Sequence, residues 1–240
     1  MRSFLVAWRD FSSYLHGFYG YMIIAALLLI QGVLYQAIAL GNGARYSAEV
    51  LNLFFVTATW ATGFAGWLLS MRSVAEERQT RTEMVLQTAP ISPAEIIFGK
   101  YLAVMGMVTL FVLCTLHMPS MILIYGKVSI GQVIVGYIGL LLYGSASAGI
   151  GIFASSLVRT QVASVVLSGG MIALLALVFW LASLTEPPFS TLFEHVALFN
   201  KHMPPFHEGL LSFEHCVYFV SVTWLFLTLA TQVLHWRRSQ

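Results

Sequence analysis

The chain has 240 residues, of which 58% are hydrophobic and only 9% are charged. A soluble domain carries about 25% charged residues, so this composition excludes a soluble enzyme and places most of the chain in lipid. The formal net charge is only +2 and the basic residues are scattered, which excludes a nucleic-acid-binding stripe.

Residues 1–20 are predicted to form an amphipathic helix that lies at the cytosolic surface of the membrane. Five large apolar side chains would be poorly placed in water, so we favour this interpretation over a plain extension of the first span. At about 100° per residue, these five apolar side chains fall within an arc of roughly 80°, and polar residues lie on the opposite side of the helix. The apolar arc holds Phe4, Trp8, Phe11, Leu15 and Phe18, and the opposite side holds Arg2, Arg9, Ser13 and His16.

Six apolar stretches are long enough to cross a membrane, since a spanning helix needs about 20 such residues. They cover 21–40, 50–71, 101–125, 130–154, 162–183 and 217–234. The sequence therefore predicts an all-α polytopic membrane protein with a single transmembrane domain over 1–240. Its parts are an interfacial helix at 1–20, spans one and two at 21–71, a cytosolic segment at 72–100, spans three to five at 101–183, an outer loop at 184–216, and span six with a cytosolic tail at 217–240.

The distribution of lysine and arginine predicts the orientation, because positive residues gather on the cytosolic side. Nine of them lie on one side of the predicted membrane and three on the other. The larger group is Arg2, Arg9, Arg72, Arg78, Arg81, Lys100, Arg159, Arg237 and Arg238, and the smaller is Arg45, Lys127 and Lys201. Both termini and the 72–100 segment are therefore expected in the cytosol.

Apart from His117, the predicted spans hold no Asp, Glu, Lys, Arg or His. Ion-coupled transporters and charged-filter channels usually carry such groups within the membrane, so these classes are disfavoured. An intramembrane enzyme is also disfavoured, because there is no GxSxG or HExxH motif, and no Walker A motif occurs either. The run of small residues from Gly144 to Gly151 is interpreted as a face for close helix packing. His117 lies two residues before Pro119, and it is interpreted as a hydrogen-bonded helix histidine or as part of a local kink.

The segment between spans two and three is the most informative part of the sequence. Residues 75–90 read AEERQTRTEMVLQTAP, and Ser92-Pro93-Ala94-Glu95 has the pattern of a capping box. A helix is therefore expected to begin near Pro93 and to enter lipid near Tyr101. The alternating charges and the short apolar stretch fit either a solvated hairpin tip or a docking element for a partner, and the residues alone favour neither.

Three motifs in chain order resemble those of ABC-2 type transporter permeases, and the resemblance covers essentially the whole chain. Within that family, the chain most resembles the compact permeases of gliding-motility and nitrous-oxide-reductase-maturation systems. The chain departs from the family pattern at Arg81, where glycine is usual, and in the altered acidic stretch at 209–215. The motifs are Ala75-Glu76-Glu77 with Thr82, Glu83, Pro90 and Gly99-Lys100; the turn at 149–168 with Gly151, Phe153, Ser155-Ser156-Leu157 and Gln161; and His202, Phe206, Gly209, Tyr218-Phe219 and Arg237-Arg238.

The resemblance implies a permease subunit in a bacterial or archaeal cytoplasmic membrane that works as a homodimer with a separate ABC ATPase. That ATPase would bind ATP and magnesium, and no cofactor is expected on this chain. A permease of this kind is also compatible with an accessory subunit on the outer side of the membrane. Charge reversal at Glu77 or Glu83 is expected to uncouple the complex without unfolding the spans. The expected coupling residues are Glu76, Glu77, Arg78, Arg81 and Glu83, with Met84 and Leu86 as apolar anchors. The alternative is a membrane anchor that transports nothing and recruits a cytosolic ATPase or motor.

The outer loop contains several residues that bind soft metals. His195, His202 and His207 are the candidate ligands, because imidazole suits copper and zinc. Their spacings of seven and five residues do not match a compact site. Since the loop also contains Pro187-Pro188 and Pro204-Pro205, we favour a re-entrant or capping element at the membrane surface, with no resident metal.

Overall fold

The computed structural model describes residues 2–39, 41, 46–80, 91–182 and 201–238, and most of these residues are helical, with no strand among them. Six of the helical segments are long and apolar enough to cross a membrane. This confirms the prediction of an all-α polytopic membrane protein. The helices are α1 (Arg2–His16), α2 (Phe18–Leu34) with a π-helical turn at Tyr35–Ala39, α3 (Ser47–Ser70), α4 (Ala75–Gln79), α6 (Pro93–Cys114), α7 (His117–Tyr125), α8 (Ile130–Leu157), α9 (Gln161–Ala182), α11 (Pro204–His207) and α12 (Phe213–Arg238).

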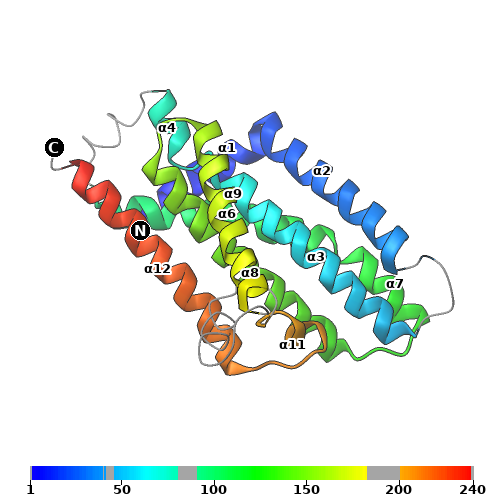
Figure 1. Ribbon diagram of the computed structural model, residues 1–240. Helices are drawn as coiled ribbons and strands as arrows, with labels where there is room; N and C mark the ends of the chain where they lie inside the picture. The colour runs from blue at the N-terminus through cyan, green and yellow to red at the C-terminus, as the bar shows by residue number, and fades with distance from the viewer. Residues whose placement is uncertain (1, 40, 42–45, 81–90, 183–200, 239–240) are drawn as a thin grey trace.

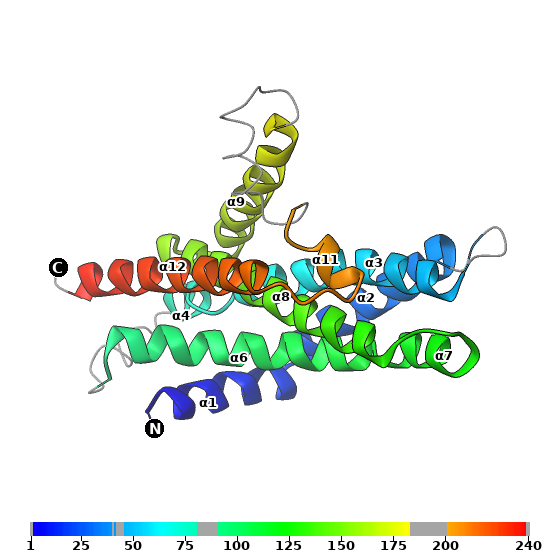
Figure 2. The same ribbon diagram turned by 90° about the horizontal axis from the view of Figure 1, so that it is seen from below.

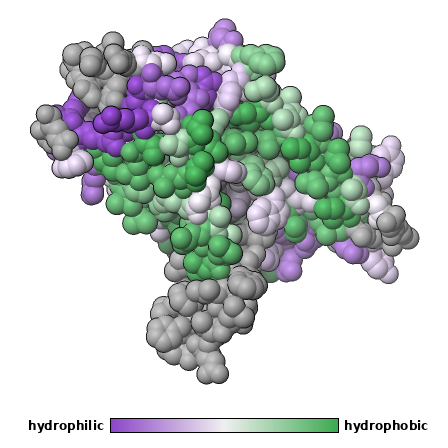
Figure 3. All heavy atoms as spheres, turned by 45° about the horizontal axis from the view of Figure 1, so that its top comes forward, coloured by the Kyte–Doolittle hydropathy of each residue, from purple (hydrophilic) through white to green (hydrophobic). Residues whose placement is uncertain are grey.

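Apart from α9, the long helices run side by side, and the molecule has two distinct ends (Figures 1 and 2). Both chain termini and the short helix α4 lie at one of them, which we call the α4 end. The short helix α11 lies at the other, which we call the α11 end. Figure 3 shows hydrophilic surface gathered at the α4 end beside a broad hydrophobic band, as expected for a helix bundle whose middle lies in lipid.

Helices α3 and α8 form the centre of the bundle. About two thirds of the most apolar part of each is buried, against 11% for α9. Figure 2 shows α9 leaning away from the other long helices. The protein therefore has a tightly packed centre, and α9 is the least buried of its described spans.

Glycines bring α3 and α8 close together. A Cβ atom on Gly66 would lie 2.9 Å from the carbonyl oxygen of Gly144 and 3.1 Å from the backbone nitrogen of Ala148. The hydroxyl of Ser147 donates to the carbonyl of Gly63 across the same interface, at 2.7 Å. The interpretation of the small residues of span four as a packing face is thus confirmed.

Two predicted local features also appear in the structure. The hydroxyl of Ser92 accepts from the backbone N–H of Glu95, whose carboxylate accepts from the N–H of Ser92, so the capping box begins α6 at Pro93. The third span is divided into α6 and α7 by a turn before His117. Pro119 lacks the N–H that would bond to the carbonyl of Thr115, and its ring would collide with that carbonyl in a continuous helix. The kink is therefore a consequence of this proline.

Helix α1 runs across the α4 end of the bundle, as the views in Figures 1 and 2 together show. Its apolar arc remains largely uncovered, with Phe4 66% and Trp8 63% exposed. A second, narrow face packs on α6 and extends to Phe11 at the edge of the apolar arc: a Cβ atom on Gly99 would touch Val6, and one on Gly106 would touch the ring of Phe11. The sequence pattern had suggested an apolar and a polar face, and the structure adds this third face that attaches α1 to the protein.

Candidate functional site

Helix α4 lies in the segment where the sequence predicts a coupling site, and its first backbone groups are bound by another helix. It has only five residues and no side-chain cap of its own. The hydroxyl of Ser155, in the last turn of α8, accepts from the N–H groups of Val74 at 3.1 Å and Ala75 at 2.9 Å. The same hydroxyl donates to the carbonyl of Met71. Ser155 therefore caps α4 from outside, because the first N–H groups of a helix have no partner within it.

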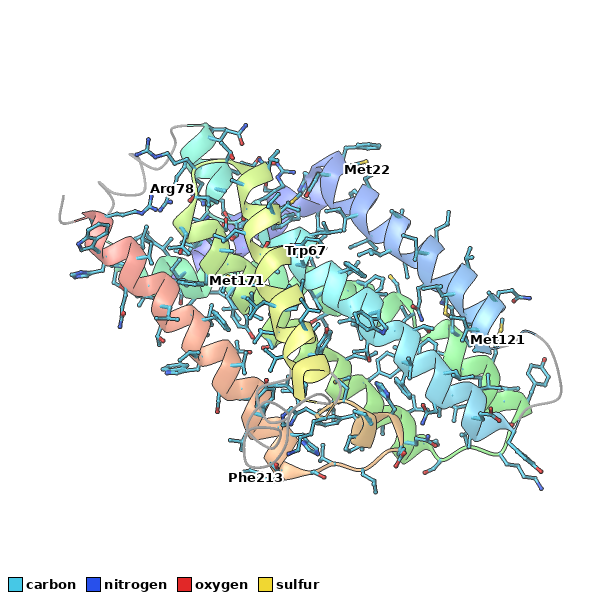
Figure 4. The ribbon with its side chains drawn as sticks, in the orientation of Figure 1. Met22, Trp67, Arg78, Met121, Met171 and Phe213 are labelled. Carbon is cyan, nitrogen blue, oxygen red and sulfur yellow. The ribbon has the colours of Figure 1, made fainter. Side chains whose placement is uncertain are left out.

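Arg78 of α4 in turn binds the end of α8. Its Nη1 donates to the carbonyls of Ser156 at 2.7 Å and Val158 at 3.0 Å. Arg237 of α12 donates to the carbonyl of Leu157 in the same turn. Figure 4 shows Arg78 at the α4 end of the bundle, where these elements meet. Since the last carbonyls of a helix lack internal partners and carry partial negative charge, two arginines are well placed there.

Glu77 joins α4 to α1 and α6 through a network of charges. Its carboxylate lies 2.8 Å from the ammonium group of Lys100 and 2.8 Å from the guanidinium group of Arg9. Lys100 also binds Asp10 of α1 at 3.2 Å and the carbonyl of Ser73. The Lys100 side chain is only 2% exposed, so this ion pair is largely removed from water. Charge reversal at Glu77 is therefore expected to disturb the fold, contrary to the expectation from sequence.

The remaining predicted coupling residues fall into two groups. Glu76 pairs with Arg72 one turn earlier at the protein surface, and the residues that follow, Gln79 and Thr80, are exposed. Arg81, Glu83, Met84 and Leu86 lie outside the described residues, and their role remains a prediction. The surface that α4 offers to a partner therefore consists of Glu76 and the exposed end of the helix, whereas Glu77 and Arg78 are engaged within the protein.

Four residues of this site were not predicted as functional: Arg9, Asp10, Lys100 and Ser155. One signal was present for Lys100, because a single lysine follows Ile96-Ile97-Phe98-Gly99 at the start of an apolar helix. A charge in such a position usually has a buried partner. Ser155 belongs to the second motif shared with the family pattern, but nothing in the sequence marks it as a cap for α4, and no signal marks Asp10. The partners of both residues are distant in sequence.

The candidate metal ligands of the outer loop do not converge in the described part of the chain. His207 is buried, and its Nε2 lies 3.0 Å from the hydroxyl of Thr59. His202 lies against Tyr218 and forms a hydrogen bond with His215 at 2.9 Å. His195 is outside the described residues. No group of three or more His, Cys, Asp or Glu that would hold a metal ion occurs among the residues that the structure describes.

Burial of His207 predicts a pH dependence of stability. Burial lowers the pKa of its imidazole to about 4, from 6.5. The unfolded chain therefore takes up a proton at this residue before the folded chain does, so stability falls as the pH drops from 6.5 towards 4. Between pH 7.5 and pH 5 this residue should cost about 2 kcal/mol of stability. Thermal unfolding of the purified protein and of His207→Gln at both pH values measures the effect. The variant should lose less stability on acidification, and equal losses would contradict the assignment.

An apolar groove opens between α3, α8 and α9. It has a volume of about 510 Å³. Trp67 of α3, labelled in Figure 4, borders it and donates to the carbonyl of Val165 and the hydroxyl of Ser168 on α9. None of the lining side chains carries a charge: they are Trp60, Gly63, Phe64, Trp67, Tyr143, Gly169, Ile172, Ala173, Ala176 and Leu177.

The sequence was compared with protein families and with curated proteins. A family model described as ABC-2 family transporter protein matches residues 24–211, well over half of the chain. The matched region includes α3, α4, α6 and α8, and hence most of the residues that meet at the α4 end. The search of curated proteins found no match.

Proposed function

Because the chain belongs to the ABC-2 family of transporter proteins, we propose that it is the permease subunit of an ATP-driven transporter whose ATPase is a separate protein docked at the α4 end. The membership makes it a multi-pass membrane component of a transporter, and it does not favour the alternative of an anchor that transports nothing. In this proposal the α4 end faces the cytosol of a bacterial or archaeal cell, and the partner binds ATP and magnesium.

One observation carries the proposal: the short helix α4 is bound to several spans at once. Ser155 and Arg78 join it to α8, and Glu77 joins it to α1 and to α6. It also contacts the beginning of α9. Since a helix of five residues is not stable alone, its position depends on these neighbours. A partner that displaces α4 would therefore act on four other helices, which is the property that a coupling element needs.

We also propose that the permease forms a homodimer and that its cargo is apolar. Helix α9 exposes more of its apolar surface than any other described span and is the span we place at the contact between copies. The uncharged groove beside it supports an apolar or lipid-like cargo rather than a small ion, because an ion would need polar groups to replace its water.

Purification from native membranes in mild detergent tests the docking of the ATPase. We expect an ATPase subunit to co-purify with the chain and to hydrolyse ATP. The double change Glu76→Lys and Glu83→Lys should reduce the bound ATPase by about tenfold or more, because like charges facing each other cost several kcal/mol in an interface. Both carboxylates are candidates for the partner-facing surface, and Glu76 holds only a surface ion pair.

Glu49→Lys is the matched control for this experiment. Glu49 is an exposed glutamate in the first turn of α3, which begins at the opposite end from α4. The same change of charge there should leave the amount of bound ATPase unaltered. If the chain purifies without an ATPase, even after gentle crosslinking in the membrane, the proposed function is wrong. Equal loss in the double variant and in the control would contradict the docking site alone.

A further inference from the structure

Helix α8 connects the α4 junction to α11 at the opposite end of the molecule. With 28 residues it is about 42 Å long, enough to cross the hydrocarbon part of a membrane. Resting on the proposed function, we propose that α8 carries the displacement of α4 to α11. Ser155 and Arg78 are the positioning residues that attach α4 to this helix.

The attachment at the α4 end is reciprocal, since each helix caps the other. Ser155 of α8 binds the first N–H groups of α4, and Arg78 of α4 binds the last carbonyls of α8. Ser155 is fully buried. If the two helices separated, N–H and C=O groups on both would lose their partners, which costs free energy. The two helix ends are therefore expected to move together.

The other half of α8 holds α11 in place. The side chain of Phe206 is fully buried and lies against Gly139, where a Cβ atom would be 2.7 Å from it. The amide of Gln132 donates to the carbonyl of His207 at 3.0 Å. Glycine at position 139 is what allows the ring to lie this close to the helix axis. A translation of α8 along its axis, or a rotation about it, would consequently change the position of α11.

Helix α3 offers a competing route, and this makes the inference testable. It leads directly into the turn before α4, and its Thr59 contacts His207 of α11. Displacement of α4 could therefore reach α11 through α3 without using Ser155 or Arg78. The two routes differ in what happens when the caps are removed, because only the α8 route passes through these two side chains.

The experiment uses the complex of the full chain with its ATPase in lipid nanodiscs. Cys114 and Cys216 are first replaced by serine, and Leu210→Cys then carries a spin or fluorescent label. Leu210 is 59% exposed and lies three residues after α11. Two quantities are measured: the ATPase rate, which reports on the docked partner, and the change in the label signal when a non-hydrolysable ATP analogue is added, which reports on α11.

In the unsubstituted complex, we expect the analogue to change the label signal. Ser155→Ala, and separately Arg78→Gln, should reduce that change by about fivefold or more when complexes with equal amounts of bound, active ATPase are compared. Ser156→Ala is the matched control: this neighbouring serine is equally buried, but its hydroxyl donates to Phe153 of its own helix. It should leave the signal unaltered, which a general loosening of the packing would not do. Arg78→Gln provides a second test if Ser155→Ala fails to fold.

Four results would overturn the inference. A full label response in both Ser155→Ala and Arg78→Gln would show that the displacement reaches α11 by another route, such as α3. Equal losses in Ser155→Ala and Ser156→Ala would show that these serines act only through packing. If the unsubstituted chain binds no ATPase, the proposed function itself fails and the inference fails with it. If it binds an active ATPase but the label never responds, the proposed function stands and this inference alone is wrong.

Discussion

Glu77→Lys is expected to lower the midpoint of thermal unfolding by about 10 °C. The carboxylate of Glu77 faces Lys100, whose side chain is 2% exposed, and Arg9. A lysine at position 77 would place a third positive charge beside these two and leave the buried ammonium group with Asp10 as its only remaining carboxylate within the described network. Removing one member of a buried ion pair costs about 3–5 kcal/mol, because the other charge remains out of water. Thermal unfolding of the purified protein in detergent measures the loss.

Glu76→Lys is the control, because it makes the same change one residue earlier in the same short helix. Glu76 pairs with Arg72 at the protein surface, and both side chains are partly solvated. Such a surface pair contributes about 0.3–0.5 kcal/mol, so the midpoint should fall by no more than about 3 °C. Equal losses in the two variants would show that the network around Lys100 contributes no more than a surface ion pair.

Gly66→Leu is expected to disrupt the contact between α3 and α8. The new side chain would begin 2.9 Å from the carbonyl oxygen of Gly144 and 3.1 Å from the nitrogen of Ala148. These are backbone atoms of a helix, so they cannot rotate away as a side chain could. The two central helices would have to separate, at a cost of about 3 kcal/mol or more. We expect the midpoint of thermal unfolding to fall by about 10 °C.

Gly170→Leu tests whether the effect comes from the helix contact rather than from the loss of a glycine. Both glycines lie within spanning helices, but a Cβ atom on Gly170 would meet nothing within 4 Å. Leucine also favours a helix over glycine by about 1 kcal/mol. Gly170→Leu should therefore unfold at the same temperature as the unsubstituted chain or slightly above it. If Gly66→Leu unfolds at the same temperature as the unsubstituted chain, α3 and α8 do not pack as closely as described.

The charges near α4 divide into two classes with different experimental meaning. Glu77 and Arg78 are bound to α1, α6 and α8, so their replacement changes the permease itself. Glu76 and the exposed end of α4 are accessible from outside, so their replacement tests the proposed docking of a partner. A loss of ATPase in a Glu77 variant would therefore not locate the interface, because the helix that carries the interface would have moved.

The features that the sequence predicted correctly depend on residues close together in the chain. Six apolar stretches of about 20 residues predicted the six spans, since the length of an apolar stretch determines whether it can cross a bilayer. Ser92 and Glu95 predicted the start of α6, because a capping box involves only four consecutive residues. Small residues in span four predicted its close packing. An even number of spans also agrees with both termini lying at one end (Figure 1).

The tertiary structure alone decided which charged residues act within the protein. Asp10 and Lys100 are 90 residues apart in sequence, and Ala75 and Ser155 are 80 residues apart. A glutamate in a polar segment has the same local pattern whether it faces water or a buried lysine, so the sequence did not distinguish Glu76 from Glu77. Only the packing of α1, α6 and α8 around α4 creates that difference, because it places Glu77 against the buried Lys100 and leaves its side chain 18% exposed, against 35% for Glu76.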